Sequence, residues 1–212
     1  MLNAYPDFVP QVSVIMATYN RVALLPRAIN SVLAQTGVSF ELIVIDDGSS
    51  DATFELMRTY TDAHANIRYV RHKNRGQSLS VNAGISLALG TYLTFLDSDD
   101  EYLPNHLLDR WQFMQQNPKV DLGFGGLEII GNPYLKDRKD PSKLVHIDEC
   151  AGLASFFAKK YVFEKLNGFA NMLYSADGDL MERAQQFFVT QRFTERTYRY
   201  YRDTPDSICN NM

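Results

Sequence analysis

The sequence predicts an α/β fold built on a doubly wound sheet. Two observations support this prediction. Short runs of β-branched and aliphatic residues alternate, through the first half of the chain, with segments whose apolar residues recur at helical spacing. The two runs at 12–16 and 40–45 each end in a polar cluster, as expected of parallel strands that are buried on both faces. Because ligands of such sheets bind beyond the carboxyl ends of the strands, these clusters are the candidate site.

The elements of the first half follow in strict alternation. Strands are predicted at 12–16, 40–45, 67–70 and 92–96, and helices at 25–33, 52–60, 78–89 and from Pro104 to about Asn117. Pro26 is tolerated because it falls in the first turn of its helix, and Gly90 is expected to close the third helix.

The second half is less regular. Strands are predicted at 120–130, 155–159 and 197–201, a polar loop at 132–142, a short helix after 159, and a further helix at 177–188. The sequence has no internal repeat, no low-complexity tract and no long linker, so residues 1–212 are predicted to form one domain.

Composition excludes several classes of protein. The chain has 212 residues, 45% of them hydrophobic, and a net charge of −4, which gives no field to attract nucleic acid. The two cysteines, Cys150 and Cys209, are too few for a disulfide framework, so we expect reduced thiols in the cytoplasm. We expect no signal peptide and no membrane-spanning segment. Peripheral association with the inner face of the membrane is compatible with this sequence.

The densest chemical signal is the run Asp97-Ser98-Asp99-Asp100 after an apolar strand. In an extended segment, Asp97 and Asp99 point the same way, and converging carboxylates suit Mg²⁺ or Mn²⁺. An EF-hand is a poor alternative because Tyr102 occupies the sixth position, where the loop needs glycine. On these residues alone, an acidic turn that caps the helix near Pro104 stays open, and Asp100 is the residue expected to cap it.

A second acidic cluster, residues 46–51, also follows a strand and opens a helix. Gly48 permits the turn, and Ser49 or Ser50 is expected to cap the helix. That structural interpretation needs one acid, whereas the cluster has three. A receiver domain is disfavoured because it needs a lone phospho-acceptor and a lysine at a later strand end, where this chain has residues 97–100.

Four blocks of sequence occur in a characteristic order, at residues 12–21 (VSVIMATYNR), 41–51 (ELIVIDDGSSD), 74–100 and 175–183 (SADGDLMER). In sequence and spacing they resemble family 2 glycosyltransferases of the GT-A fold. The resemblance implies one GT-A domain with a nucleotide-binding mixed sheet and helices on both faces. It further implies a nucleotide-sugar-binding half at about 10–100 and an acceptor-binding half at about 101–212.

The resemblance implies a base-binding set at the first two strand ends. Asp47 would accept the uracil N3–H, Tyr19 would pack on the ring, and the Ala17 backbone would add a hydrogen bond. Arg75 lies where a family arginine approaches the base, and a surface role for it is equally compatible with the alignment.

The resemblance also implies a metal site. Asp97 would approach the ribose or the metal, and Asp99 would ligate Mg²⁺ or Mn²⁺ together with the diphosphate. Oxygen ligation is the chemistry expected, because the four histidines are not spaced as a ligand pair. They are His64, His72, His106 and His146.

For the catalytic base the resemblance points to Asp177, followed by Leu180 and Arg183 at the family spacing. The chain departs from the family at Ala176, where an acid is usual.

Asp179 and Arg202 are two further candidate site residues. Asp179 competes for the catalytic role, but with Glu182 it forms a D-x-x-E pair that is typical of a capping box, and we favour that structural role. Arg202 could reach the diphosphate, or belong to a basic, aromatic strand at a sheet edge.

The sequence therefore predicts an inverting, metal-dependent glycosyltransferase of the hexosyl- or N-acetylhexosaminyl-transferase type. It would move a sugar from a nucleotide-sugar donor, a UDP-sugar being favoured, to a hydroxyl of a glycan or lipid-linked acceptor. The alternative from another class is a catalytically inactive nucleotide-sugar-binding module, for which Ala176 is the one hint. A nucleotidylyltransferase is disfavoured because ATYNR has no glycine for a phosphate loop.

Overall fold

The computed structural model describes residues 9–137, 140, 142–150, 152–172 and 175–202. Within them, the strands are β1 (Val12–Thr18), β2 (Phe40–Asp46), β3 (Ile67–Arg71), β4 (Tyr92–Phe95), β5 (Glu101–Tyr102), β6 (Leu122–Ile130), β7 (Tyr134–Lys136), β8 (Leu144–His146), β9 (Phe157–Lys159) and β10 (Thr190–Tyr201). The α-helices are α1 (Leu25–Leu33), α2 (Thr53–Ala63), α3 (Gln77–Leu87), α4 (His106–Gln116), α5 (Lys160–Lys165) and α6 (Ala176–Gln185).

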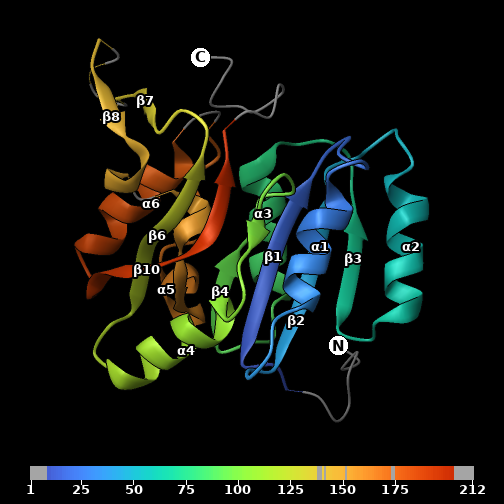
Figure 1. Cartoon of the computed structure of the whole chain (residues 1–212), viewed down its shortest axis with the longest axis horizontal. Helices are drawn as coiled ribbons and strands as arrows, with labels where there is room; N and C mark the ends of the chain where they lie inside the picture. Colours follow the sequence, from blue (N-terminus) through green and yellow to red (C-terminus); the bar gives the residue numbers. More distant parts are fainter. Residues whose placement is uncertain (1–8, 138–139, 141, 151, 173–174, 203–212) are drawn as a thin grey trace.

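Eight of the strands form one mixed sheet in the order β3-β2-β1-β4-β9-β6-β10-β5, and β7 pairs with β8 in a separate hairpin (Figure 1). Strands β3, β2, β1 and β4 are mutually parallel. Their carboxyl ends therefore lie along one edge of the sheet. This confirms the α/β prediction and places the polar clusters after β1, β2 and β4 at a common edge.

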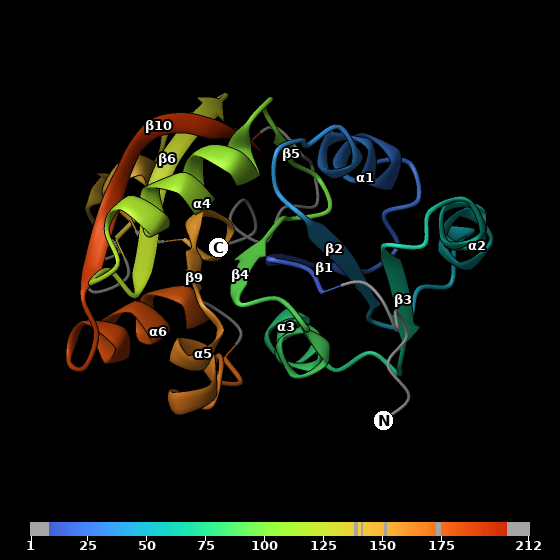
Figure 2. The same ribbon diagram turned by 90° about the horizontal axis from the view of Figure 1, so that it is seen from below.

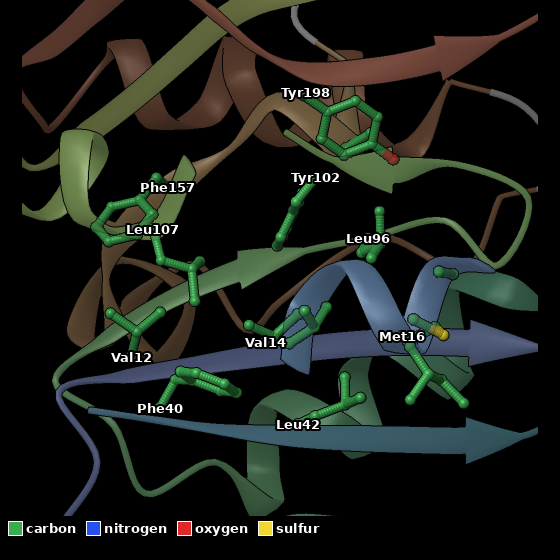
Figure 3. Packing of buried hydrophobic residues seen from close by; sticks show 14 of the residues in the cluster. Val12, Val14, Met16, Phe40, Leu42, Leu96, Tyr102, Leu107, Phe157 and Tyr198 are labelled. Carbon is green, nitrogen blue, oxygen red and sulfur yellow. The ribbon is translucent and has the colours of Figure 1, made fainter. Parts of the chain in front are cut away.

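Helices cover both faces of the sheet, as Figure 2 shows from below. Helices α1, α2 and α4 pack on one core, and α3, α5 and α6 pack on the other. Strand β1 serves both cores, because Val14 and Met16 face the first and Ile15 faces the second. Figure 3 shows the first core, where Tyr102 and Tyr198 lie above the side chains of β1 and β2. Burial on both faces is why the apolar runs of β1 and β2 are nearly continuous.

The second half departs from the sequence prediction at β10. Strand β10 begins at Thr190, seven residues before the predicted start at 197, and pairs with β6 in parallel and β5 in antiparallel. Its only buried residues are Phe193 and Tyr198, with a register shift between them. The strand therefore has no apolar alternation by which the sequence could have revealed it.

One predicted loop and two predicted helix ends also differ from the structure. The predicted loop 132–142 contains β7, an exposed strand stabilised by backbone pairing with β8 rather than by burial. Helix α4 begins at His106, not Pro104, after Asn105 in a left-handed conformation. Helix α3 ends at Leu87, before Gly90.

One class of element is absent from the described part of the chain: it contains no helix with the length and apolarity needed to cross a bilayer. Of the two cysteines, Cys150 is half-buried with a free thiol, and Cys209 lies outside the described residues.

Candidate functional site

The loops after β1 and β2 are joined to each other by hydrogen bonds. The Asn20 backbone N–H donates to Ser49 Oγ (2.9 Å), and the Ser50 N–H donates to Asn20 Oδ1 (2.8 Å). Asp51 accepts from the Thr53 N–H and hydroxyl at 3.1 and 2.6 Å. The prediction that Ser49 or Ser50 caps the helix was wrong, because the residue before α2 is Ala52 and the N–H of Thr53, the first helical residue, is bound by Asp51. Ser49 instead accepts from the loop after β1.

Asp46, at the end of β2, is a structural acid. It is fully buried and accepts from the Ser49 N–H at 2.8 Å and from the Tyr69 hydroxyl. Burial, followed by the hydrogen bond to Asp46, raises the pKa of Tyr69 well above its usual value. Two of the three acids in residues 46–51, Asp46 and Asp51, therefore shape the turn.

Asp47 joins β2 to the loop that follows β3. Its two carboxylate oxygens accept the backbone N–H groups of Arg75 (2.8 Å) and Gly76 (2.9 Å). His72 Nδ1 lies 3.3 Å from Asp47 Oδ1. The two segments approach so closely that a Cβ on Gly48, where φ is +84°, would lie 2.8 Å from the Asn74 nitrogen. Asp47 is 4% exposed, and lone pairs beyond those used remain on its oxygens.

The other residues predicted to bind the base lie at the same edge. The Asp47 backbone N–H donates to the Thr18 carbonyl (2.8 Å), which places Asp47 beside the end of β1. Tyr19 follows at once and is 49% exposed, while Ala17 is half-buried. The Arg75 side chain is exposed, and its backbone N–H is the one bound to Asp47. The structure thus brings these residues to one rim of the sheet.

Beyond β4, Asp97 lies in an electrostatic cluster with Asp99 and Asp177. Burial first, then the charges of Asp99 and Asp177, raise the pKa of Asp97 to about 7. Arg21 acts in the opposite direction, as does the Gln77 side chain, which donates to Asp97 Oδ1 at 3.2 Å. The carboxylates predicted for metal binding and for catalysis are therefore near neighbours, although 80 positions separate Asp97 and Asp177 in the sequence.

Asp100 does not cap the following helix, contrary to the interpretation of the acidic turn. It is fully buried and accepts the Tyr198 hydroxyl (2.8 Å) and the Tyr201 N–H (2.8 Å). The Tyr198 oxygen in turn accepts the Asp97 N–H at 3.1 Å. Burial, with the charges of Asp97 and Asp99, raises the pKa of Asp100 well above its usual range. This residue fixes the acidic turn to β10.

Asp177 lies in the first turn of α6, after Ser175 in a left-handed conformation. Its carboxylate accepts the Gly178 N–H at 2.8 Å and the Leu153 N–H at 3.2 Å. These two backbone donors fix the orientation of the carboxylate. Ala176, the departure from the family pattern, is the first residue of α6, and the helix forms without an acid there.

Asp179 has a structural role, but not the one predicted. It lies inside α6 and forms an ion pair with Arg183 one turn later (2.8 Å), so it is not part of a capping box with Glu182. Arg183 also donates to the carbonyls of Leu166 and Gly168. This pair ties α6 to the end of α5.

Arg202 follows β10 directly and is 8% exposed, and its backbone N–H donates to the Ile130 carbonyl (2.9 Å). The edge-strand interpretation was wrong in detail, because β5 lies outside β10 in the sheet.

The donor set decides whether a metal fits. In the described residues, no three histidine, cysteine or acidic side chains converge as a complete metal site. Mg²⁺ and Mn²⁺ need only one or two carboxylates when a substrate diphosphate supplies further oxygens. Asp97, crowded by negative charge, and Asp99 beside it meet that requirement. Histidine ligation is not supported at His106, which is buried and stacked on Tyr102, and burial lowers its pKa well below its usual value.

The sequence did not reveal three residues that contact the acidic turn: Arg21 in the loop after β1, Gln77 on α3 and Tyr198 on β10. Arg21 Nη1 forms an ion pair with Asp99 Oδ2 at 2.8 Å. Arg21 is the last residue of the first sequence block, residues 12–21, but its role at the acidic turn was not predicted. No local signal identified Tyr198, since its contacts span about 100 residues of chain.

Four parallel strands that carry polar loops at one edge, extended by a mixed second half, define an α/β domain of the GT-A class. Residues 13–174 match the family model "Glycosyl transferase family 2", so the chain belongs to that family.

Among curated relatives, an uncharacterized glycosyltransferase of Rickettsia felis is 42% identical over 107 residues, 50% of this chain and 18% of that protein. The succinoglycan biosynthesis protein ExoO of Rhizobium meliloti is 42% identical over 101 residues, 48% and 29% of the two chains. The matched segments thus cover less than a third of the length of these two relatives.

Solved structures share the fold. S. aureus TarS 1–349 in complex with UDP-GlcNAc has a TM-score of 0.78 at 18% identity, over 93% of this chain and 60% of that one. The mannosyltransferase PcManGT of Pyrobaculum calidifontis, in complex with GDP-Man and Mn²⁺, has a TM-score of 0.72 at 18% identity, over 92% and 57%. At these identities the likeness establishes the fold.

Proposed function

We propose that this domain is an inverting, metal-dependent glycosyltransferase that moves a sugar from a UDP-sugar to a hydroxyl group. The observation that carries the proposal is the placement of Asp97 and Asp99 on one turn after β4, where burial and the charges of Asp99 and Asp177 raise the pKa of Asp97. A cation bound by Asp97 and Asp99 would relieve their repulsion, and the Asp177 carboxylate is the kind of group that deprotonation of an acceptor requires.

Donor binding falls to the rim formed by the ends of β1 and β2. Asp47, held by two backbone N–H groups, presents acceptor oxygens suited to an imide N–H, which uracil has and cytosine lacks. The exposed ring of Tyr19 suits stacking on the base. Arg75, exposed at the same rim, is assigned to the base, and Arg202 to the diphosphate.

Asp177 is the proposed general base. The N–H groups of Leu153 and Gly178 hold its carboxylate in a fixed orientation, from which it would take the proton of the acceptor hydroxyl. That oxygen attacks the anomeric carbon from the face opposite the nucleotide, and one displacement inverts the configuration. When bound by Asp97 and Asp99, Mn²⁺ or Mg²⁺ would stabilise the negative charge of the departing diphosphate.

The named relatives guide the choice of substrates. TarS is described with UDP-GlcNAc, PcManGT with GDP-Man and Mn²⁺, and ExoO is named for succinoglycan biosynthesis. We propose a UDP-sugar because Asp47 suits the uracil N3–H, and GDP is the competitor to test, since guanine also offers N–H groups to a carboxylate. A growing polysaccharide or lipid-linked glycan at the cytoplasmic face of the membrane is the acceptor we propose.

The test combines binding and turnover. The protein is titrated with UDP and with GDP by calorimetry, with Mn²⁺ and with EDTA, and release of nucleoside diphosphate from several nucleotide sugars is measured over a panel of acceptors. We expect Mn²⁺-dependent UDP binding that is lost in Asp99→Ala and kept in Asp62→Asn, a substitution of an exposed acid on α2.

The outcomes separate the candidate functions. Transfer of a sugar supports the enzyme. Binding of nucleotide sugars without hydrolysis or transfer across the whole panel would favour the inactive binding module instead. Tighter binding of GDP than of UDP would refute the assignment of Asp47.

A further inference from the structure

Arg21 is a positively charged residue that is paired with an acid of the Asp97–Asp100 turn. It follows β1 and forms an ion pair with Asp99 across to the loop after β4, with Nη1 and Oδ2 2.8 Å apart. The pair is shielded from water, because the two side chains are only 14% and 15% exposed. A shielded pair of this kind contributes more electrostatic energy than an exposed one.

The charge of Arg21 acts on more than one acid. It lowers the pKa of Asp97, against the effects of burial, Asp99 and Asp177, which raise it. Arg27 lies near but differs in its contacts, since it donates to the Asp99 backbone carbonyl and stacks on the Tyr201 ring, 3.9 Å from the centroid. Arg21 is thus the cation that faces the carboxylate of Asp99.

We propose that Arg21 is the resident counter-ion of this site and makes binding of the divalent cation depend on the donor's diphosphate. This proposal rests on the proposed function, in which Asp97 and Asp99 hold the metal. A lone Mn²⁺ that approaches Asp99 meets a guanidinium already paired to the same carboxylate. A diphosphate arriving with the cation adds negative charge and offers the guanidinium new oxygen acceptors, to which arginine binds well.

The physical consequence is cooperativity between metal and nucleotide. Each improves the affinity of the other by the same factor, since coupling between two binding sites is reciprocal. If Arg21 were only a brace for the loop after β1, its removal would leave Mn²⁺ affinity unchanged or weaken it by misplacing Asp99. The two roles therefore predict opposite signs.

The experiment measures Mn²⁺ binding by electron paramagnetic resonance of free Mn²⁺, first without nucleotide and then with UDP. Loss of a positive charge 2.8 Å from Asp99 should strengthen binding of Mn²⁺ alone, so Arg21→Ala should bind it at least about tenfold more tightly than the unmodified protein. The enhancement of Mn²⁺ affinity by UDP should shrink correspondingly. Arg21→Lys, which keeps the charge, should stay close to the unmodified protein.

The control is Arg58→Ala, which removes one positive charge from the exposed surface of α2 and should leave Mn²⁺ affinity unchanged. Circular dichroism of each variant checks the fold. Equal or weaker binding of Mn²⁺ alone by folded Arg21→Ala would overturn the proposal, as would an equal gain in Arg58→Ala. If the unmodified protein binds no Mn²⁺ even with UDP, the proposed metal-dependent function is refuted. This outcome differs from the failure of the Arg21 proposal, in which the unmodified protein still binds Mn²⁺ with UDP.

Discussion

Asp97 should destabilise the metal-free protein at neutral and alkaline pH. Its pKa is about 7 in the folded chain against an ordinary value of 3.8. Between these two values the folded protein binds more protons than the unfolded chain, so the free energy of unfolding falls as the pH rises from about 4 through 7. Above pH 7 the loss is complete. Asp97→Asn removes this loss and should be more stable than the unmodified protein there.

The size of the effect follows from the shift. A difference of about 3 units at about 1.36 kcal/mol per unit gives an upper bound of about 4 kcal/mol. Water reaches part of this half-buried side chain, which reduces the effect below that bound. We therefore expect Asp97→Asn to gain about 1–3 kcal/mol at pH 8 and little at pH 4.

Urea unfolding in EDTA at pH 4, 6 and 8 measures this difference, with Asp62→Asn as the control for loss of an exposed acid. Added Mn²⁺ and UDP should reverse the order of stability, because the ligands bind the folded form of the unmodified protein more tightly. A stability difference that does not change between pH 4 and pH 8, or a destabilised Asp97→Asn at pH 8, would refute the electrostatic account.

Three further predictions follow from the site. Asp177→Asn should keep UDP affinity but lose about 10²–10⁴-fold in transfer rate, measured by steady-state kinetics. Asp179→Asn should keep transfer and lower stability by about 1 kcal/mol or less in thermal unfolding, because its ion pair with Arg183 is partly exposed. If Asp179→Asn is inactive and Asp177→Asn active, the two roles must be exchanged. Asp47→Ala should weaken UDP about ten- to a hundredfold by calorimetry, and unchanged affinity would remove it from base recognition. Tyr198→Phe deprives buried Asp100 of a hydroxyl donor and should lower the free energy of unfolding by about 1–3 kcal/mol, an effect that denaturant titration would detect and whose absence contradicts the assigned hydrogen bond.

Most of the first half of the fold could be predicted because strands β1, β2 and β4 are buried on both faces. Residues 12–16 and 40–45 read as continuous apolar runs, and their alternate side chains enter two different cores. The first part of strand β10, residues 190–196, could not be predicted, because Phe193 is its one buried side chain and the pairing of β10 with β6 is interrupted by a register shift. Backbone pairing holds such a strand and leaves little trace in the sequence.

The positions of the site acids followed from topology, whereas their partners did not. Parallel strands bring their carboxyl ends to one edge, so Asp47 and Asp97 were expected to lie at a common rim. The contacts that define their roles join distant segments, as in Arg21 with Asp99 and Tyr198 with Asp100, which are 78 and 98 residues apart. Helix capping was overestimated for the same reason, since a polar side chain near a helix start can bind a distant partner.

The run of residues 97–100 shows how tertiary contacts give three similar acids different chemistry. Asp97 is crowded by other acids, Asp99 is paired with Arg21, and Asp100 is enclosed by Tyr198 and the Tyr201 backbone. Because Asp100 makes its hydrogen bonds inward, it anchors the turn and leaves the other two carboxylates on the accessible side. A cation site needs that division, since ligands that are free to reorient would lose entropy on binding the metal. Buried Asp100 thus fixes the geometry on which the proposed metal binding by Asp97 and Asp99 depends.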